Sequence, residues 1–459
     1  MVLESLTPVL EWLGRYWAVL LFYITIGVIV YYNREKFEFE GKFIALYKTK
    51  FGIEMMKKFI KPVSHKRQLI GKYLFWISLP LLILSSIALG ILSFYYIYLY
   101  YVLAFIIFSL SSLTLIATVI WFGQLERAGT LGIYVGFIGM ALILIMVAYG
   151  VYQLIFEPTA PPMFTPVLPG FQIPGGPTIP LIQGLLALFV VVVIHEFAHG
   201  VISKLYKIRI KSSGFAMIGP LPAAFVEPDD KKLEKAPAKH QLSMYAAGPF
   251  SNVLLGLFLV IIINLIGLLS LSIYAPGGIS VVDSDNSMPE GLEEGMIIDY
   301  FNGEEVRTLN ELQTAVGNRS PGETITLRTN EGDRELTLQE HPDNNGTGYM
   351  GLYLDQHVRG NNSFIDFISP AYFWLFGNPY GTTLDTQLGL LGWIFLLTIG
   401  IGLVNLLPLG PVDGGRMILL KLQQHFSDNT AKKIWGTLSY VLLALIILLI
   451  FVPIIRALI

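Results

Sequence analysis

The sequence predicts a polytopic α-helical membrane protein with a small β-rich soluble domain inserted between two membrane-embedded halves. Of its 459 residues, 54% are hydrophobic and only 14% are charged. An average soluble domain carries about 25% charged residues, so this chain has too little polar surface for a soluble protein. Between residues 274 and 358 the apolar runs give way to short alternating stretches with turn signals, which predicts the inserted domain.

The charge balance and the lack of cysteine exclude several kinds of protein. The formal net charge is −2, which argues against a nucleic-acid-binding protein. The chain has 0 cysteines, which excludes disulfides, thiolate zinc sites, iron–sulfur clusters and a cysteine nucleophile. Any metal must therefore be held by His, Asp or Glu. The first apolar run is not followed by a small-residue cleavage site, so we expect no cleavable signal peptide.

Eight apolar stretches approach or exceed the length of about 20 residues that a membrane-spanning helix needs. They lie at 16–32, 73–94, 99–122, 131–155, 180–204, 246–273, 387–409 and 436–456.

The distribution of Lys and Arg predicts the orientation of these spans. Residues 34–72 contain 11 Lys and Arg, so we expect this loop to be cytoplasmic and the N-terminus to be outside. Alternation across the spans then places 205–245 and 410–435 inside, and 156–179 and 274–386 outside. The segment 156–179 contains no Lys or Arg. Three glycosylation sequons, at Asn318, Asn345 and Asn361, fall in the outside segment 274–386.

The chemistry is carried by the motif His195-Glu-Phe-Ala-His199. On a helix, positions i and i+4 share one face, so both histidines can ligate one zinc, and Glu196 can act as general base on a water. The motif lies in a run that is otherwise uncharged between Pro180 and Lys204. Each ionisable residue inside a span costs about 2.5–3.5 kcal/mol on insertion scales. Metal ligation would offset that cost; the alternative is a polar helix-packing cluster without metal.

A catalytic zinc usually has three protein ligands and one water, so a third ligand is needed. Residues 202 and 203 are Ile and Ser, so the same segment supplies no third histidine. The candidate carboxylates are Glu227, Asp229, Asp230 and Asp413. The first three cluster in a charged loop, where a solvated acidic patch is the default interpretation.

Asp413 stands in a different setting. It ends an apolar run in which Pro408, Gly410 and Pro411 break the helix. Irregular backbone at membrane depth is tolerated where it lines protein or a water-filled cavity. We therefore expect Asp413 to turn inward from a non-helical segment, although without the HExxH motif it would be interpreted as a structural residue.

The two motifs together resemble the site-2 protease family of intramembrane zinc metalloproteases. HExxH in one span is followed by Asn405-x-x-Pro408-x-x-x-x-Asp413-Gly in another. Two further stretches are similar to the family: 247–252, which opens the span after the motif, and 214–229, which resembles a membrane-associated β-hairpin. The resemblance covers about 175–435.

The resemblance implies a site and an activity. His195, His199 and Asp413 would hold one zinc per chain, and Glu196 would activate the water and deliver its proton to the leaving amine. Asn405 would lie near the scissile peptide. For Asn252 the resemblance leaves substrate binding, support of the site and packing of the span open. The reaction would be hydrolysis of a peptide bond within or near the transmembrane helix of a single-span protein in the lipid bilayer. The site would lie nearer the cytoplasmic face.

Residues 274–358 resemble a PDZ domain, another small β-rich exported domain being the alternative. The similar features are Gly291 to Gly295, Ile298 to Gly303 and Pro321-Gly322, in that order. A PDZ groove would bind a substrate C-terminus or act as a size filter. The sequence then divides into N-terminal spans with the basic loop (1–174), a first catalytic half (175–273), the PDZ-like domain (274–358) and a second catalytic half (359–459).

Other functions remain open from the residues. A catalytically silent membrane receptor or chaperone would bind substrates through the PDZ-like domain, but it would have no need of Glu196. An ion transporter would show polar residues in several spans, and a protease of prenylated C-termini would carry a downstream acidic helix motif. The hairpin at 214–226 either offers an edge strand to an extended substrate or only dips into the lipid interface.

Overall fold

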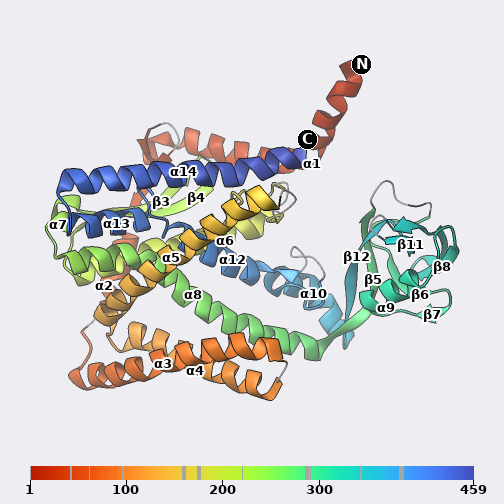
Figure 1. Cartoon of the computed structure of the whole chain (residues 1–459), viewed down its shortest axis with the longest axis horizontal. Coiled ribbons are helices and arrows are strands. Elements are labelled where there is room, and N and C mark those ends of the chain that lie inside the picture. The colour runs from red at the N-terminus through yellow and green to blue at the C-terminus, as the bar shows by residue number, and fades with distance from the viewer. Residues whose placement is uncertain are drawn as a thin grey trace. The chain divides into compact units, whose positions relative to one another are not determined.

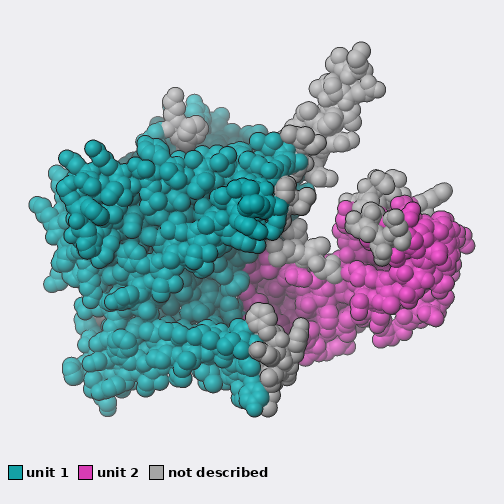
Figure 2. All heavy atoms as spheres, viewed as in Figure 1, with its two compact units in different colours: residues 1–261, 393–459 teal, residues 262–392 magenta. Residues whose placement is uncertain are grey.

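The structure is a computed structural model of the chain (Figure 1). It describes residues 2–458 except 42–43, 61, 96–97, 158–161, 173–176, 220, 285–288, 290, 342–343 and 382–386. The chain divides into two compact units, one formed by 1–261 and 393–459 and the other by 262–392 (Figure 2).

Six helices among the described residues are long and apolar enough to cross a membrane. This confirms the predicted polytopic α-helical membrane protein. Their large side chains are extensively exposed, for example Ile138 at 68% and Tyr440 at 77%, which suits a surface in contact with lipid. The six helices are α3 (His65–Tyr95), α4 (Tyr98–Trp121), α5 (Leu125–Phe156), α6 (Leu181–Leu205), α8 (Ala238–Ile273) and α14 (Asp428–Leu458).

The other two predicted spans correspond to shorter apolar helices. The first is Tyr16–Tyr32 within α1 (Val2–Tyr32), and the second is α12 (Leu390–Val404). The predicted span 387–409 is therefore too long at its end, because the chain leaves the helix before Pro408. An apolar helix that we did not expect, α10 (Ser363–Phe376), lies between them in the sequence.

The glycines of α5 let other helices approach it closely, as small residues do in membrane interfaces. A Cβ added at Gly132 would lie 3.3 Å from Phe250 of α8. One added at Gly136 would lie 2.8 Å from Met417 on α13 (Asp413–Gln423). Because α13 and the motif-bearing helix α6 also contact α5, the two parts of the chain that carry the chemical motifs share one helix as a support.

A four-stranded antiparallel sheet accompanies these helices, with strand order β1-β2-β3-β4. The predicted hairpin forms β3 (Ile210–Ile218) and β4 (Leu221–Pro228), although Pro220 in its turn lies outside the described residues. The loop that we predicted at 34–72 supplies β1 (Glu38–Glu40) and β2 (Ile44–Thr49), and β2 pairs with Ser213–Ile218 of β3. The hairpin is thus half of a larger sheet, with β4 as one edge.

Two more helical segments of unit 1 flank this sheet. The segment that follows β2 forms α2 (Phe51–Phe59), which packs on α6, and the one that follows β4 forms α7 (Asp230–Glu234). The ring of Phe59 meets that of Phe197 edge-on, with centroids 5.6 Å apart. A short 3-10 turn, Arg34–Lys36, precedes β1.

The second unit contains the inserted β-rich domain, consistent with the predicted PDZ-like domain. Its main sheet has the order β12-β5-β6-β8-β9, with β7 paired to β6, and β10 pairs with β11. Ile279, Ile298 and Leu327 are fully buried in its core. Thr308 and Glu311 form a capping box on α9 (Leu309–Gly317). The strands are β5 (Tyr274–Ser284), β6 (Ile297–Phe301), β7 (Glu304–Glu305), β8 (Thr324–Thr329), β9 (Gly332–Thr337), β10 (Gln339–His341), β11 (Asn344–Tyr349) and β12 (Leu352–Gly360).

Candidate active site

Two buried histidines of α6 face one carboxylate from α13. His195 is 5% exposed and His199 is 8% exposed. The Nε2 atom of His195 lies 3.1 Å from Oδ2 of Asp413, and that of His199 lies 3.3 Å from the same oxygen. The i, i+4 spacing places both rings on one helical face, and 218 residues of sequence separate His195 from Asp413. The three predicted ligand residues are brought together.

The chain reaches Asp413 through an irregular segment that joins α12 to α13. We expected Asp413 to lie in the irregular segment, and this was wrong, because Asp413 is the first residue of α13. The N–H of Gly414 donates to the carbonyl of Asn405 at 2.8 Å. A side chain at Gly414 or Gly415 would collide with backbone carbonyls of the irregular segment. The two glycines therefore let the start of α13 fold back onto the irregular segment.

The surroundings of the two histidines differ. The Nδ1 atom of His199 lies 2.7 Å from the carbonyl oxygen of Met244. Because a carbonyl only accepts, Nδ1 must carry a proton, and in the neutral ring this leaves the Nε2 lone pair for a metal ion. Nδ1 of His195 is buried and has no hydrogen-bond partner among the described residues.

The donor set and the space in front of it fit a zinc ion. A Cβ added at Gly248 of α8 would lie against the Nε2 atoms of both His195 and His199, so this glycine keeps the space open. In a tetrahedral zinc site with metal–ligand distances of about 2.0–2.1 Å, ligand atoms lie about 3.3 Å apart. The nitrogen–oxygen separations of 3.1 and 3.3 Å match that spacing. Two imidazoles and one carboxylate are a common donor set of catalytic zinc.

Glu196 links this cluster to the sheet. One of its ligand atoms lies within 4.8 Å of those of His195 and His199. Its Oε2 accepts a hydrogen bond from the N–H of Val226 at 3.2 Å. Val226 belongs to β4, the edge strand of the sheet, so the candidate base stands beside that strand.

The other three acidic candidates do not join the cluster. Glu227 accepts from the Ser212 hydroxyl at 2.6 Å and pairs with Lys211 at 3.2 Å, and both contacts lower its pKa. Lys211 also pairs with Asp230 at 3.3 Å. Asp229 is the N-cap residue of α7. Glu227 and Asp230 therefore serve a surface ion-pair cluster.

Asn252 and Asn405 make no hydrogen bond to the histidines or to Asp413 in the described part of the chain. Asn252 is 2% exposed on α8, and its Nδ2 and Oδ1 atoms are buried without a partner among the described residues. A Cβ at Gly402 of α12 would lie 3.2 Å from its Cβ. Asn405 directly follows α12, and its backbone oxygen accepts a hydrogen bond from the N–H of Gly414. A substrate-binding role for either residue stays a prediction.

Three groups that shape the site were not predicted from the sequence: Gly248, the carbonyl of Met244 and the N–H of Val226. Only Gly248 could have been noticed in the sequence, because a glycine inside a long apolar helix costs stability and usually marks a place where another group packs closely against the helix. Backbone groups leave no mark in the residue pattern.

Comparison with known proteins bears on the family to which the chain belongs. The family model described as peptidase family M50 matches residues 183–449. An uncharacterized protein of Methanocaldococcus jannaschii is 28% identical over 240 residues, which are 52% of this chain and 57% of that protein. The zinc metalloprotease RasP of Shouchella clausii is 26% identical over 267 residues, 50% of this chain and 62% of that protein.

A further relative agrees with these matches. The regulator of sigma-W protease RasP of Bacillus subtilis is 23% identical over 231 residues, 43% of this chain and 54% of that protein. The chain thus spans between 54% and 62% of the length of these three relatives.

Proposed function

The chain belongs to peptidase family M50, which confirms the resemblance to the site-2 proteases, and we propose that it is an intramembrane zinc metalloendopeptidase. It would hydrolyse a peptide bond within or near the transmembrane helix of single-span, membrane-anchored proteins, as in regulated intramembrane proteolysis. The observation that carries the proposal is the convergence of His195 and His199 on one oxygen of Asp413, at 3.1 and 3.3 Å.

The three convergent residues would hold one zinc per chain. Zinc in such a site supplies Lewis-acid polarisation of a carbonyl and makes water acidic enough to attack near neutral pH. The Met244 carbonyl holds the proton of His199 on Nδ1 and so keeps Nε2 available as a ligand. Gly248 keeps the space in front of both Nε2 atoms free of side chains.

Glu196 acts as the general base. Its carboxylate takes a proton from the attacking water and hands it to the leaving amine. The Val226 N–H holds Oε2 at 3.2 Å, which orients the carboxylate. A catalytically silent receptor or chaperone, the alternative function, has no use for a carboxylate held beside two ligand histidines.

The substrate peptide binds in an extended form along β4. A helical substrate hides its carbonyls in its own hydrogen bonds and must be unwound before attack. β4 is an edge strand in the sheet order β1-β2-β3-β4, so it can pair with an added strand. Support comes from the contact of Val226 with Glu196, because a strand paired to β4 would pass beside the base.

The β-rich domain would bind a substrate C-terminus or filter substrates by size. We place it outside the cytoplasm and the active site nearer the cytoplasmic face. The support is the concentration of Lys and Arg in 34–72 and 205–245, which the positive-inside rule assigns to the cytoplasm.

Cleavage of a single-span reporter by the Glu196→Gln variant tests the proposal. The amide keeps the shape of the side chain and cannot take the proton, so we expect cleavage to fall at least 100-fold while zinc content stays unchanged. Glu234→Gln, which makes the same change at an exposed position of α7 outside the sheet, is the control and should cleave like the wild type. Wild-type cleavage by Glu196→Gln would rule out the assigned base.

A further inference from the structure

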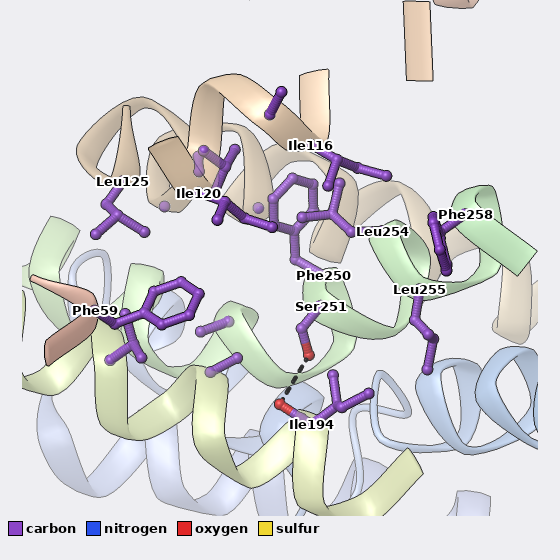
Figure 3. Close-up of a pocket in the computed structure, with 18 of the residues that line it drawn as sticks. Phe59, Ile116, Ile120, Leu125, Ile194, Phe250, Ser251, Leu254, Leu255 and Phe258 are labelled. Carbon is purple, nitrogen blue, oxygen red and sulfur yellow. Dashed lines mark hydrogen bonds between the residues drawn. The ribbon is translucent and has the colours of Figure 1, made fainter. Parts of the chain in front are cut away.

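An apolar cavity lies between α2, α4, α5, α6 and α8, with a volume of about 780 Å³. Figure 3 shows Phe59, Ile120, Leu125, Phe250 and Leu254 around it. None of the described residues that line it is charged.

The polar groups of the lining do not call for a polar ligand. Ser251 is one of its few polar residues, and its hydroxyl donates to the carbonyls of Gly248 at 2.7 Å and Ile194 at 3.4 Å. Since this hydroxyl is already satisfied within the protein, the surface offers an occupant apolar contact, as a hydrocarbon chain requires.

The cavity reaches about half-way across a bilayer. Its lining runs along α4 from Leu110 to Trp121 and along α8 from Ala247 to Phe258, which is about 16 Å of helix in each case. The hydrocarbon core of a bilayer is about 30 Å thick. A substrate helix that crosses the hydrocarbon core needs about 20 residues, or about 30 Å of helix, nearly twice the length of this lining. Its dimensions therefore suit an acyl chain of one leaflet better than a substrate helix.

Two lysines stand at the end of the cavity that is marked by Phe59 and Trp121. Lys57 precedes Phe59 on α2 by two residues, and Lys204 follows the lining residue Val201 on α6 by about one turn. Because α2 packs on α6, the two lysines stand on neighbouring helices, Lys57 exposed and Lys204 half-buried. Among the residues that the structure describes, neither lysine forms an ion pair. Two like charges without a counter-ion beside an apolar cavity suit an anionic head group.

We propose that this cavity binds an anionic phospholipid, with one acyl chain in the cavity and the phosphate between Lys57 and Lys204. The lipid packs on Ile194 and Ala198 of α6 and on Ala247 of α8, which are sequence neighbours of His195, His199 and Gly248. It therefore supports the two helices that shape the candidate active site from a face that the substrate does not use.

The proposal is tested by lipid binding to the purified full-length protein in detergent, measured by native mass spectrometry. The probes are dioleoyl phosphatidylglycerol and dioleoyl phosphatidylcholine. A juxtamembrane lysine contributes roughly fivefold to binding of anionic lipid, so Lys57→Gln with Lys204→Gln should weaken phosphatidylglycerol binding about 25-fold. The control pair, Lys231→Gln with Lys232→Gln, removes the same charge from exposed positions of α7 and should leave binding unchanged.

A second variant tests the acyl-chain part of the proposal. Ala117→Phe fills the cavity lining and should reduce binding of both lipids at least tenfold, whereas Ala88→Phe, outside the lining, should not. Equal affinity of the wild type for the two lipids would overturn the head-group assignment. Unchanged lipid binding in Ala117→Phe would overturn the proposal. If this variant also lost reporter cleavage, the cavity would be assigned to a substrate helix instead.

Discussion

At the scale of single residues, the site brings together ionisable side chains that would each destabilise the protein if buried alone inside a membrane span. His195 and His199 are buried in a helix that is apolar enough to cross a membrane. A charged or polar group at that depth needs a partner, and the Nε2 atoms of both histidines meet one oxygen of Asp413 at the spacing that a shared metal ion would require. Gly248 completes the arrangement by leaving room where any side chain would lie against both nitrogens.

Gly248→Ala tests the role of that room. The added methyl group would occupy the space before both Nε2 atoms, so we expect zinc affinity to fall at least tenfold, as measured by competition with a chromogenic chelator. Gly256→Ala adds the same methyl group on the same helix, where the nearest side-chain atom, on Thr398, lies 3.7 Å away, and should bind zinc like the wild type. Equal zinc affinity of the two variants would contradict the assigned position of the metal.

Asp413→Ala tests the third ligand. Loss of a group that supports a ligand typically costs 10–100-fold in metal affinity, so removal of a ligand should lower zinc affinity by roughly 100-fold or more. Asp230→Ala, which removes an acid of the surface cluster, should not change it. Full zinc occupancy in Asp413→Ala would move the third ligand elsewhere, with Glu227 and Asp229 next to examine.

At the scale of elements, the active site depends on a sheet whose strands come from distant parts of the sequence. β2 lies more than 160 residues before β3 and pairs with six of its residues, Ser213–Ile218. This pairing turns the predicted hairpin into a sheet with β4 at one edge, beside Glu196. The basic N-terminal loop thereby becomes part of the structure that would receive the substrate.

Gly214→Ala tests the importance of that pairing. A Cβ at Gly214 would collide with the carbonyl oxygen of Tyr47 on β2, so the strands must separate locally. We expect reporter cleavage to fall about tenfold at unchanged zinc content, because the metal ligands lie on helices and β4 loses its support. Gly90→Ala, where no atom lies within 4 Å of the added methyl group, is the control. Wild-type cleavage by Gly214→Ala would show that β2 does not support the substrate strand.

The elements also show what a sequence can predict here. The HExxH histidines follow from helical spacing alone, because positions i and i+4 share a face whatever surrounds the helix. Asp413 was one of four acids that the residues left open, and only the resemblance to a family selected it. The pairing of β2 with β3 was missed, because a strand in a loop carries no mark of a partner more than 160 residues away. The room that Gly248 leaves likewise depends on how α8 packs against α6.

At the scale of the whole molecule, the helices of the first unit bring two separated stretches of sequence to one site. The inserted β-rich domain lies between those stretches in the chain and belongs to the second unit. The proposed roles of the β-rich domain and of the active site depend on how the molecule is oriented in the membrane. The orientation decides on which side of the membrane the β-rich domain meets the substrate's ectodomain.

The lack of cysteine allows a direct test of orientation. The chain has 0 cysteines, so a single introduced thiol is the only site for a membrane-impermeant maleimide. We expect Ser320→Cys in the β-rich domain to be labelled in intact cells, and Ser427→Cys before α14 to be labelled only after lysis. Both positions are exposed. The reverse pattern would contradict the orientation predicted from Lys and Arg.

The central claim is that His195, His199 and Asp413 form one zinc site. The measurement that tests it most directly is the zinc content, by elemental analysis, of the freshly purified wild type beside His195→Ala. We predict about one zinc per wild-type chain and its loss in the variant, because a two-ligand site lacks the donor set of a catalytic zinc. No zinc in the wild type, or equal zinc in both proteins, would contradict the account.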